Sequence, residues 1–306
     1  MEEQTFRAYS QKQAQAYLSG RGQDNENLFG VICEHHASTG GHFGTLLDLG
    51  CGPGNSTRPI AKHFERAYGI DASEAMIATG IEVGRNAVDG ETKTGGKVEY
   101  KVGRVDEDTL KLKEEGIEID LIIAGMAAHW FDLPKFWEAA GRALKRGGTV
   151  ALWQYPSLAC FHPSMPNAME ATAILNRLIE VDTGEFEKPG NRICREAYHN
   201  LCMPWDVSPP VAGFSREGFK RMEWDREGKL SSGDHFFLGD KATTVQLVYE
   251  GICTSSMVQR WREGNPQLAD TDEDVAVKAI KRVRELIGRE EVIAGRDCVL
   301  LLFKKS

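Results

Sequence analysis

Three closely spaced glycines after a short apolar run are the residues that point most directly to chemistry. Leu46–Gly54 reads Leu-Leu-Asp-Leu-Gly-Cys-Gly-Pro-Gly, which predicts a buried strand that ends in a glycine-rich turn. Glycine accepts positive φ angles and lets the backbone approach a ligand closely. Asp48 lies just before the turn, and Asp71 ends the next apolar segment. This arrangement favours a site for a nucleoside-containing cofactor.

The glycine spacing separates two classes of such cofactors. Dinucleotide-binding turns usually read G-x-G-x-x-G, whereas Gly50, Gly52 and Gly54 give G-x-G-x-G. The early third glycine favours a ligand without a pyrophosphate, and S-adenosylmethionine (SAM) is such a ligand. Amides of the turn and of the helix N-terminus are expected to meet its carboxylate. Asp71, about twenty residues beyond the turn, is expected to accept both ribose hydroxyls.

The elements that position these residues alternate between strand and helix. Alternation of this kind predicts an α/β fold, in which a parallel sheet carries helices on both faces. Pro134 suits the first turn of a helix, and the basic residues and glycines of Arg142–Gly148 predict its C-terminal cap. The predicted strands are Thr45–Leu49, Arg66–Ile70, Val98–Val102, Asp120–Ala124 and Thr149–Tyr155, and the predicted helices are Ser56–Phe64, Ser73–Asn86 and Leu133–Leu144.

The pattern changes after Tyr155. Seven of the eleven prolines lie between Pro156 and Pro210, which predicts an irregular insertion or cap. A helix is expected over residues 243–262, and a second one follows a capping box at Thr271 and Asp274 and ends at Gly288. Cys298–Phe303 reads as a buried strand that rejoins the main sheet. The predicted division of a single domain 1–306 is 1–44 as helices over the cofactor and substrate site, 45–155 as the SAM-binding core, 156–262 as a substrate cap with the sixth-strand region, and 263–306 as the last helix and strand.

Composition restricts the class of protein. The chain has 306 residues, a formal net charge of -8 and 41% hydrophobic residues, enough for a sizeable core. The acidic balance argues against a general nucleic-acid partner. Met1–Gln4 lacks the apolar stretch of a signal peptide, and the longest apolar run, Leu121–Ala128, is too short to span a bilayer. A cytoplasmic protein without a membrane partner is expected. Its seven cysteines lack the pair spacing of a disulfide framework or a metal site, so no metal is expected; the oligomeric state stays open.

Together these segments resemble a known family. Leu46–Gly54, Gly69–Ser73 and Arg142–Gly148 resemble the class I SAM-dependent methyltransferases. Ala128–Asp132, followed by Phe136, resembles the trans-aconitate methyltransferase-like group. The resemblance implies a doubly wound, mostly parallel, Rossmann-like sheet of seven strands, with the last strand antiparallel and SAM across the carboxyl ends. The predicted cap would be inserted after the fifth strand.

The resemblance also implies cofactor contacts. The glycine turn would line the methionine part and Asp71 the ribose, while the segment 103–106 would lie beside adenine. Many relatives have an acid where Arg104 stands, so Val105 or Asp106 is expected to contact the adenine amino group instead. The end of the fourth strand would approach the sulfonium. The predicted cofactor-binding residues are Asp48, Gly50, Cys51, Gly52, Asp71, Ala72, Met76, Arg104, Val105, Asp106 and Ala124.

Substrate contacts are predicted at two other places. Tyr17 and Arg21 resemble a Tyr-x-x-x-Arg-Pro signature of the family, with Gly22 in place of the proline. His129, next to Trp130, is the candidate catalytic base with Asp132 nearby, and a satisfied buried histidine is an equal alternative. The predicted substrate-binding residues are Tyr17, Arg21, His129, Trp130 and Trp153.

The chemistry of the acceptor decides whether such a base is needed. A carboxylic acid is ionised at neutral pH and attacks directly, whereas an aliphatic hydroxyl must lose a proton as it attacks. The sequence shows no clear base, which favours methyl-ester formation on a small, trans-aconitate-like organic acid. The alternatives are O-, N- or S-methylation of a secondary metabolite, a nicotinamide-dependent oxidoreductase, and a SAM-binding protein without activity.

Overall fold

The computed structural model describes residues 9–21, 26–86, 90–231 and 233–306. The chain forms two compact units. Unit 1 comprises Met1–Gln154, Asn200–Met222 and Leu300–Ser306, and unit 2 comprises Tyr155–His199 and Glu223–Val299. The predicted division into core, cap and C-terminal parts stays a prediction. None of the described helices is both long and apolar enough to cross a membrane.

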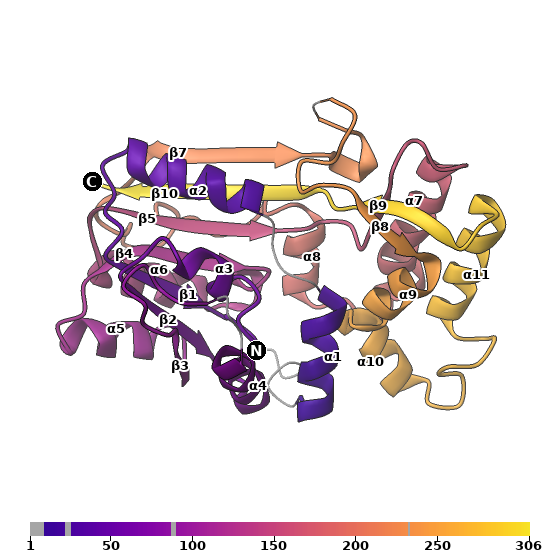
Figure 1. The fold of residues 1–306 in the computed structure, drawn as a ribbon, viewed down its shortest axis with the longest axis horizontal. Coiled ribbons are helices and arrows are strands. Elements are labelled where there is room, and N and C mark those ends of the chain that lie inside the picture. Colours follow the sequence, from indigo (N-terminus) through magenta and orange to yellow (C-terminus); the bar gives the residue numbers. More distant parts are fainter. Residues whose placement is uncertain (1–8, 22–25, 87–89, 232) are drawn as a thin grey trace. The chain divides into compact units, whose positions relative to one another are not determined.

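A seven-stranded sheet forms the centre of unit 1, with the order β3-β2-β1-β4-β5-β10-β7. The pairs β3–β2, β2–β1, β1–β4 and β4–β5 are parallel, and Figure 1 shows β10 running opposite to β5. All of β1 is buried, as expected for a parallel strand covered on both faces. The predicted fold class is therefore confirmed. The strands are β1 Thr45–Leu49, β2 Arg66–Asp71, β3 Glu99–Val102, β4 Ile119–Gly125, β5 Leu144–Gln154, β7 Phe214–Trp224 and β10 Cys298–Lys305.

The helices of unit 1 follow the predicted order with two additions, α5 and the 3₁₀ turn η1, which the sequence did not indicate. In α6, Phe136, Trp137 and Ala140 are buried on one face, and Pro134 lies in the first turn as predicted. The Asp132 carboxylate caps this helix by accepting the Lys135 N–H at 3.4 Å. The helices are α1 Gln11–Arg21, α2 Glu26–Ser38, α3 Thr57–Ala61, α4 Glu74–Asn86, α5 Glu107–Glu114, the 3₁₀ turn η1 Ala128–Trp130, and α6 Leu133–Ala143.

The predicted glycine cap after α6 is wrong. The helix ends at Ala143, and β5 begins at Leu144 and continues through Gly147 and Gly148. The β4–β5 register shifts between Ile119 and Leu121. Gly147 has a φ of +75°, and a Cβ on Gly148 would lie 2.6 Å from Leu144 Cγ. The two glycines therefore permit a bulge at the start of a long strand rather than the end of a helix.

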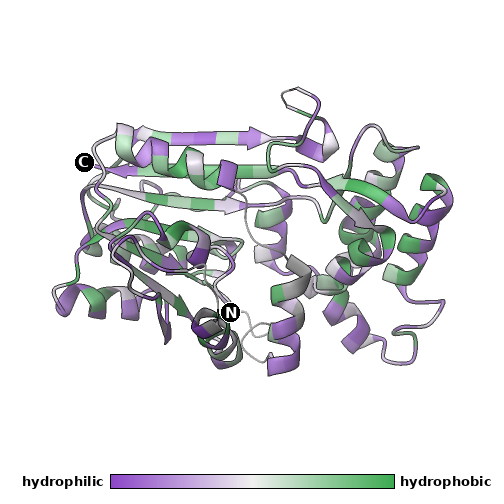
Figure 2. Cartoon of the chain, in the orientation of Figure 1, coloured by the Kyte–Doolittle hydropathy of each residue, from purple (hydrophilic) through white to green (hydrophobic). Residues whose placement is uncertain are grey.

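Unit 2 is built from helices and a small antiparallel sheet of order β6-β9-β8. Its core joins apolar residues of α7, α9 and α11, among them Leu175, Val248 and Ile280. Figure 2 shows both hydrophilic and hydrophobic stretches on these helices, as expected when one face is buried. The elements are β6 Cys160–Phe161, α7 Ala168–Arg177, η2 Leu178–Asp182, η3 Gly184–Phe186, α8 Pro189–Arg195, η4 Arg226–Gly228, β8 Lys241–Thr244, α9 Val245–Cys253, α10 Ser256–Gly264, α11 Val275–Ile287 and β9 Glu291–Gly295.

Three expectations for this part of the chain need correction. The stretch after Tyr155 is not irregular, because α7 and α8 lie within it. The helix expected over 243–262 is two helices: the Thr254 hydroxyl donates to the Gly251 carbonyl at 2.7 Å, and Ser255 is extended. Asp274 is itself the N-cap of α11, accepting the Ala276 N–H at 2.8 Å. The predicted end of α11 at Gly288 is confirmed by its left-handed φ of +70°.

Candidate functional site

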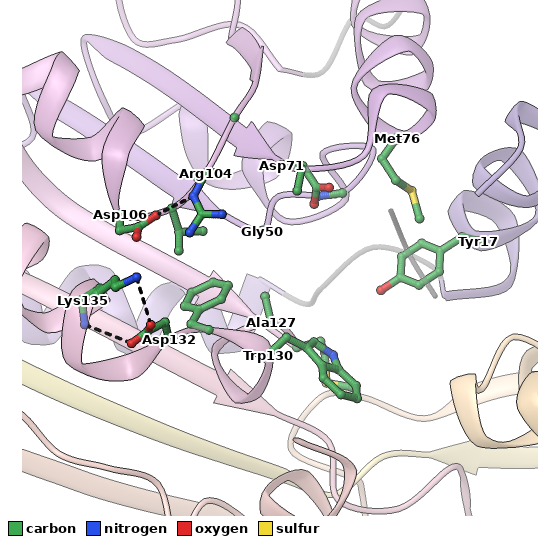
Figure 3. Close-up of a pocket in the computed structure, with 16 residues that line it drawn as sticks. Tyr17, Gly50, Asp71, Met76, Arg104, Asp106, Ala127, Trp130, Asp132 and Lys135 are labelled. Atoms are coloured by element: carbon green, nitrogen blue, oxygen red, sulfur yellow. Dashed lines mark hydrogen bonds and ion pairs between the residues drawn. The ribbon is translucent and has the colours of Figure 1, made fainter. Parts of the chain in front are cut away.

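A cavity of about 490 Å³ lies in unit 1 where β1, β2, β3 and β4 end. These are the carboxyl ends of parallel strands, and the order of the sheet reverses between β1 and β4, where open α/β sheets bind ligands. The volume is within the roughly 300–1,000 Å³ of small-molecule sites. Its lining residues, drawn in Figure 3, are Tyr17, Gly50, Gly52, Asp71, Ala72, Met76, Gly103, Arg104, Val105, Asp106, Met126, Ala127, Trp130, Phe131, Asp132 and Lys135.

The glycine turn forms one edge of this cavity. Gly50 has a φ of +67°, and a Cβ there would lie 2.6 Å from the Ala127 Cβ, so only glycine fits. The amides of Gly50 and Cys51 both donate to the Ile70 carbonyl, at 2.8 and 3.1 Å. The Gly52 amide donates to Asp71. These amides are engaged within the protein, and the expectation that amides of the turn meet a ligand carboxylate stays a prediction.

Asp71, at the end of β2, connects the turn to the start of α4. One carboxylate oxygen accepts the Gly52 N–H and the other accepts the Ser73 N–H, both at 2.8 Å. The side chain borders the cavity (Figure 3). A carboxylate offers about four acceptor sites, so this group has the capacity to fix the turn and also to accept hydroxyl donors from a ligand.

Three predicted cofactor residues lie behind the cavity instead of lining it. Asp48 is buried and accepts the Thr57 hydroxyl at 2.6 Å, which fixes α3 against β1. Ala124 is fully buried in β4. The Cys51 thiol is buried, and burial together with the nearby Asp48 and Asp71 carboxylates raises its pKa well above the ordinary value. Cys51 is therefore a neutral thiol, not a nucleophile.

The loop after β3 forms a polar wall. Arg104 Nε lies 3.4 Å from Asp106 Oδ1 and 3.1 Å from Glu107 Oε1. Burial tends to raise the pKa of Asp106, but backbone N–H donors at positions 106 and 107 and the Arg104 charge outweigh it, so the pKa is lowered. Asp106 is ionised at neutral pH and suits an amino-group donor. Arg104 lines the cavity while its guanidinium is held by the two acids.

The rest of the lining is mostly aromatic and apolar, with one ion pair. Tyr17 of α1 packs with Met76 of α4, and Figure 3 shows the phenol and the thioether beside each other at the cavity. Trp130, Phe131 and the Asp132–Lys135 pair, whose charged atoms lie 3.4 Å apart, complete the lining. Phe131 and Lys135 were not predicted from the sequence. Both residues follow β4 closely in the sequence, at the same edge of the sheet as the glycine turn, and this position could have predicted them.

The structure does not bring every predicted substrate residue to the cavity. His129 is buried, and its ring centroid lies 4.9 Å from that of Trp130. Trp153 is fully buried in β5 and packs edge-on against Phe29 with centroids 6.2 Å apart. Arg21 is the last residue of α1, and its side chain lies outside what the structure describes. Of the predicted set, Tyr17 and Trp130 line the cavity.

Comparisons with known proteins agree with this geometry. Residues 47–152 match the family described as "Methyltransferase domain". A Dictyostelium discoideum protein named as a methyltransferase is 30% identical over 142 residues, covering 46% of this chain and 47% of the relative. A Saccharomyces cerevisiae protein named as an S-adenosylmethionine-dependent methyltransferase is 31% identical over 117 residues, covering 37% and 38% of the two chains. The chain thus spans half or less of the length of these curated relatives.

The fold likeness extends over more of the chain. A structure from Anaeromyxobacter dehalogenans, named as a type II methyltransferase, superposes with a TM-score of 0.61, covering 93% of this chain and 97% of that one at 19% sequence identity. The family match shows that residues 47–152 resemble a methyltransferase domain, and the structural likeness shows the fold. The expected cofactor class is confirmed, and the oxidoreductase alternative is not supported.

Proposed function

We propose that this protein transfers the methyl group of SAM to a small molecule, and that the unit 1 cavity holds the cofactor. The observation that carries the proposal is the position of Asp71 beside a positive-φ glycine turn, inside a methyltransferase domain. SAM, when bound, supplies an activated methyl group. The protein then has to align the acceptor, exclude water and hold any proton that must leave.

The residues of the cavity fit the parts of SAM by their chemistry. Asp71 suits the ribose hydroxyls, and Asp106 suits the adenine amino group. The absence of side chains on Gly50 and Gly52 leaves room for the methionine part beside the turn. Since the turn's amides are engaged, we assign the donor for the methionine carboxylate to the Tyr17 phenol, which reaches the cavity from α1. Met76 and Phe131 supply apolar contact.

The finer proposal is carboxyl O-methylation of a small organic acid, with a trans-aconitate-like substrate. It is supported by the titratable side chains among the described lining residues. Asp106 has a lowered pKa and is a weak base, and Asp132 is paired with Lys135. None of the described lining residues is a histidine. An ionised carboxylate acceptor needs no base, so the lining suits it better than it suits an aliphatic hydroxyl.

The experiment that tests this is a panel of acceptors with methyl-labelled SAM. The panel contains trans-aconitate, a saturated tricarboxylic acid, and alcohols, phenols, amines and thiols of similar size. A methyl ester releases labelled methanol in alkali, whereas ethers and methylated amines do not. Base-labile product from the acids supports the finer proposal. Base-stable product would support methyl transfer to a different class of acceptor. SAM binding without turnover on any acceptor would contradict the proposed catalysis.

His129 needs a separate test because it lies against Trp130 and not at the cavity lining. We propose that it positions the Trp130 ring. His129→Phe should then retain most of the rate, and the pH profile should be unchanged. A base role predicts that His129→Phe slows hydroxyl or amine acceptors far more than carboxylates and removes the limb of the pH profile that reports imidazole ionisation.

A further inference from the structure

Unit 2 holds a cluster of side chains of the kinds that bind transition metals. His162, His235 and Asp240 each offer one ligand atom, and these atoms lie within 4.8 Å of one another. Asp240 Oδ2 is 2.6 Å from His235 Nδ1 and 3.8 Å from His162 Nε2. His235 and Asp240 lie close together in the sequence, but His162 lies far from both, so only the folded chain brings the three together.

The small sheet of unit 2 explains their proximity. His162 directly follows β6, and its N–H donates to the Ile293 carbonyl of β9 at 2.9 Å. Asp240 directly precedes β8, which pairs with the other edge of β9. Gly295 of β9 has no side chain, and the space that a Cβ would occupy is filled by the Phe236 ring. The loop therefore crosses β9 here and places His235 and Asp240 beside His162.

The atoms that would not bind a metal are already held. Asp240 Oδ1 accepts the Phe236 N–H at 3.0 Å, and the Gly239 N–H closes the same turn onto the Phe236 carbonyl at 2.8 Å. His162 Nδ1 lies 2.8 Å from the Ser164 hydroxyl. Contacts of this kind fix the orientation of ligating imidazole and carboxylate groups in metal sites.

We propose that His162, His235 and Asp240 form a binding site for a Zn²⁺-type divalent transition metal ion. Tetrahedral Zn²⁺ with bonds of about 2.0–2.1 Å requires ligand atoms about 3.3 Å apart. The two distances of 2.6 and 3.8 Å bracket this value, and the ligand atoms of His162 and His235 lie within 4.8 Å of each other, so side-chain rotations would have to draw the three atoms to this spacing. Two imidazoles with one carboxylate favour zinc, nickel or copper over magnesium or calcium.

The fourth coordination position of the ion would be filled from the backbone or from solvent. The Asp234 carbonyl oxygen lies 2.8 Å from His162 Nε2, close to where the metal would bind. His162 Nδ1 also accepts the Ser164 N–H at 3.2 Å. Metal binding at Nε2 would release the hydrogen bond to the Asp234 carbonyl and shift the imidazole proton to Nδ1. Nδ1 would then give up the Ser164 N–H and donate to the Ser164 hydroxyl instead. The carbonyl or a water molecule then completes the coordination. The bound ion would tie the 233–240 loop to the ends of β6 and β8.

Metal titration of the full chain tests the site. Co²⁺ serves as the spectroscopic probe, because its tetrahedral nitrogen–oxygen sites lack the thiolate charge-transfer bands that binding to the free cysteines would produce. Zn²⁺ competition then gives the affinity. His235→Ala is the main variant, since this side chain is 79% exposed and its removal leaves the core intact. Asp240→Asn retains the shape of the third ligand.

A matched control is available. His199 is also an exposed histidine beside a carboxylate, with Nε2 3.8 Å from Glu223 Oε1, but it is outside the cluster. We expect one equivalent of metal, weakened more than about tenfold by His235→Ala and by Asp240→Asn and less than about twofold by His199→Ala. Equal affinity in the wild type and His235→Ala, a cobalt spectrum dominated by thiolate bands, or no saturable binding to the wild type would overturn the proposal.

Discussion

Replacing Asp71 by alanine should remove most of the affinity for SAM while the chain stays folded. The carboxylate is expected to accept both ribose hydroxyls, and hydrogen bonds to a charged group contribute about 1.5–3 kcal/mol each. Water replaces part of this hydrogen bonding in the variant, so we expect the binding free energy of SAM to weaken by about 3 kcal/mol, which raises Kd roughly 150-fold. Asp71→Asn should lose nearly as much, because the carboxamide has one acceptor oxygen for the two N–H donors at 2.8 Å.

The same two hydrogen bonds set the cost in stability. Loss of the Gly52 and Ser73 partners should lower the unfolding free energy by about 1–2 kcal/mol, because two N–H groups lose their charged acceptor. Calorimetric titration with SAM and thermal unfolding are measured on the same samples. Glu74→Gln is the control, since Glu74 is an exposed acid in the first turn of α4 and does not line the cavity. Wild-type SAM affinity in Asp71→Ala would refute the assignment, as would an equal loss in Glu74→Gln.

Three further predictions follow from single contacts. Gly50→Ala should weaken SAM binding more than about tenfold, because the new Cβ is strained at positive φ and lies 2.6 Å from the Ala127 Cβ. Gly116→Ala is the control: Gly116 has a φ of +78° and open space around it, so SAM affinity in the same titration should be unchanged. Burial, followed by the charges of Lys220 and Lys304, lowers the pKa of His35 to about 4. The unfolded chain therefore binds a proton at His35 more readily than the folded chain, so the full unfolding free energy is present above pH 6.5 and falls as the pH drops toward 4. Between pH 7 and pH 4.5 the unfolding free energy measured in urea should therefore fall by about 1–2 kcal/mol less in His35→Leu than in the wild type. Equal falls in the two proteins would contradict the burial argument. Asp274→Ala should lower the unfolding free energy by about 2–4 kcal/mol, because it removes the α11 cap and the 2.7 Å partner of Arg262, while Ser255→Ala, whose side chain makes no cap bond, should cost less than about 0.5 kcal/mol.

The sequence predicts the part of the fold that local chemistry determines. β1 and the glycine turn follow from an apolar run and three glycines, and β2 with Asp71 follows from the next apolar run. Pro134 predicts the start of α6 because the missing N–H has no partner in a first helical turn. The end of that helix was misplaced because Gly147 and Gly148 have the same chemistry in a cap and in a bulge. Only the pairing of β5 with β4 decides between the two.

The sequence also predicts only part of the candidate site. Asp71, Gly50 and Gly52 were predicted and line the cavity, since their roles depend on backbone geometry at strand ends. Asp48 and Ala124 were predicted as contacts and lie behind it, because a sequence does not show which side chains of a buried strand face a ligand. His162, His235 and Asp240 were missed altogether, since their cluster depends on a loop that crosses β9 at Gly295.

Photocrosslinking of methyl-labelled SAM, followed by mapping of the labelled peptide, tests the central claim most directly. The label should lie in peptides that carry the cavity residues, around Tyr17, between Gly50 and Met76, or between Gly103 and Lys135. Excess S-adenosylhomocysteine should compete it away, and NAD should not. Label confined to unit 2 peptides, or competition by NAD and not by S-adenosylhomocysteine, would contradict a SAM site in this cavity.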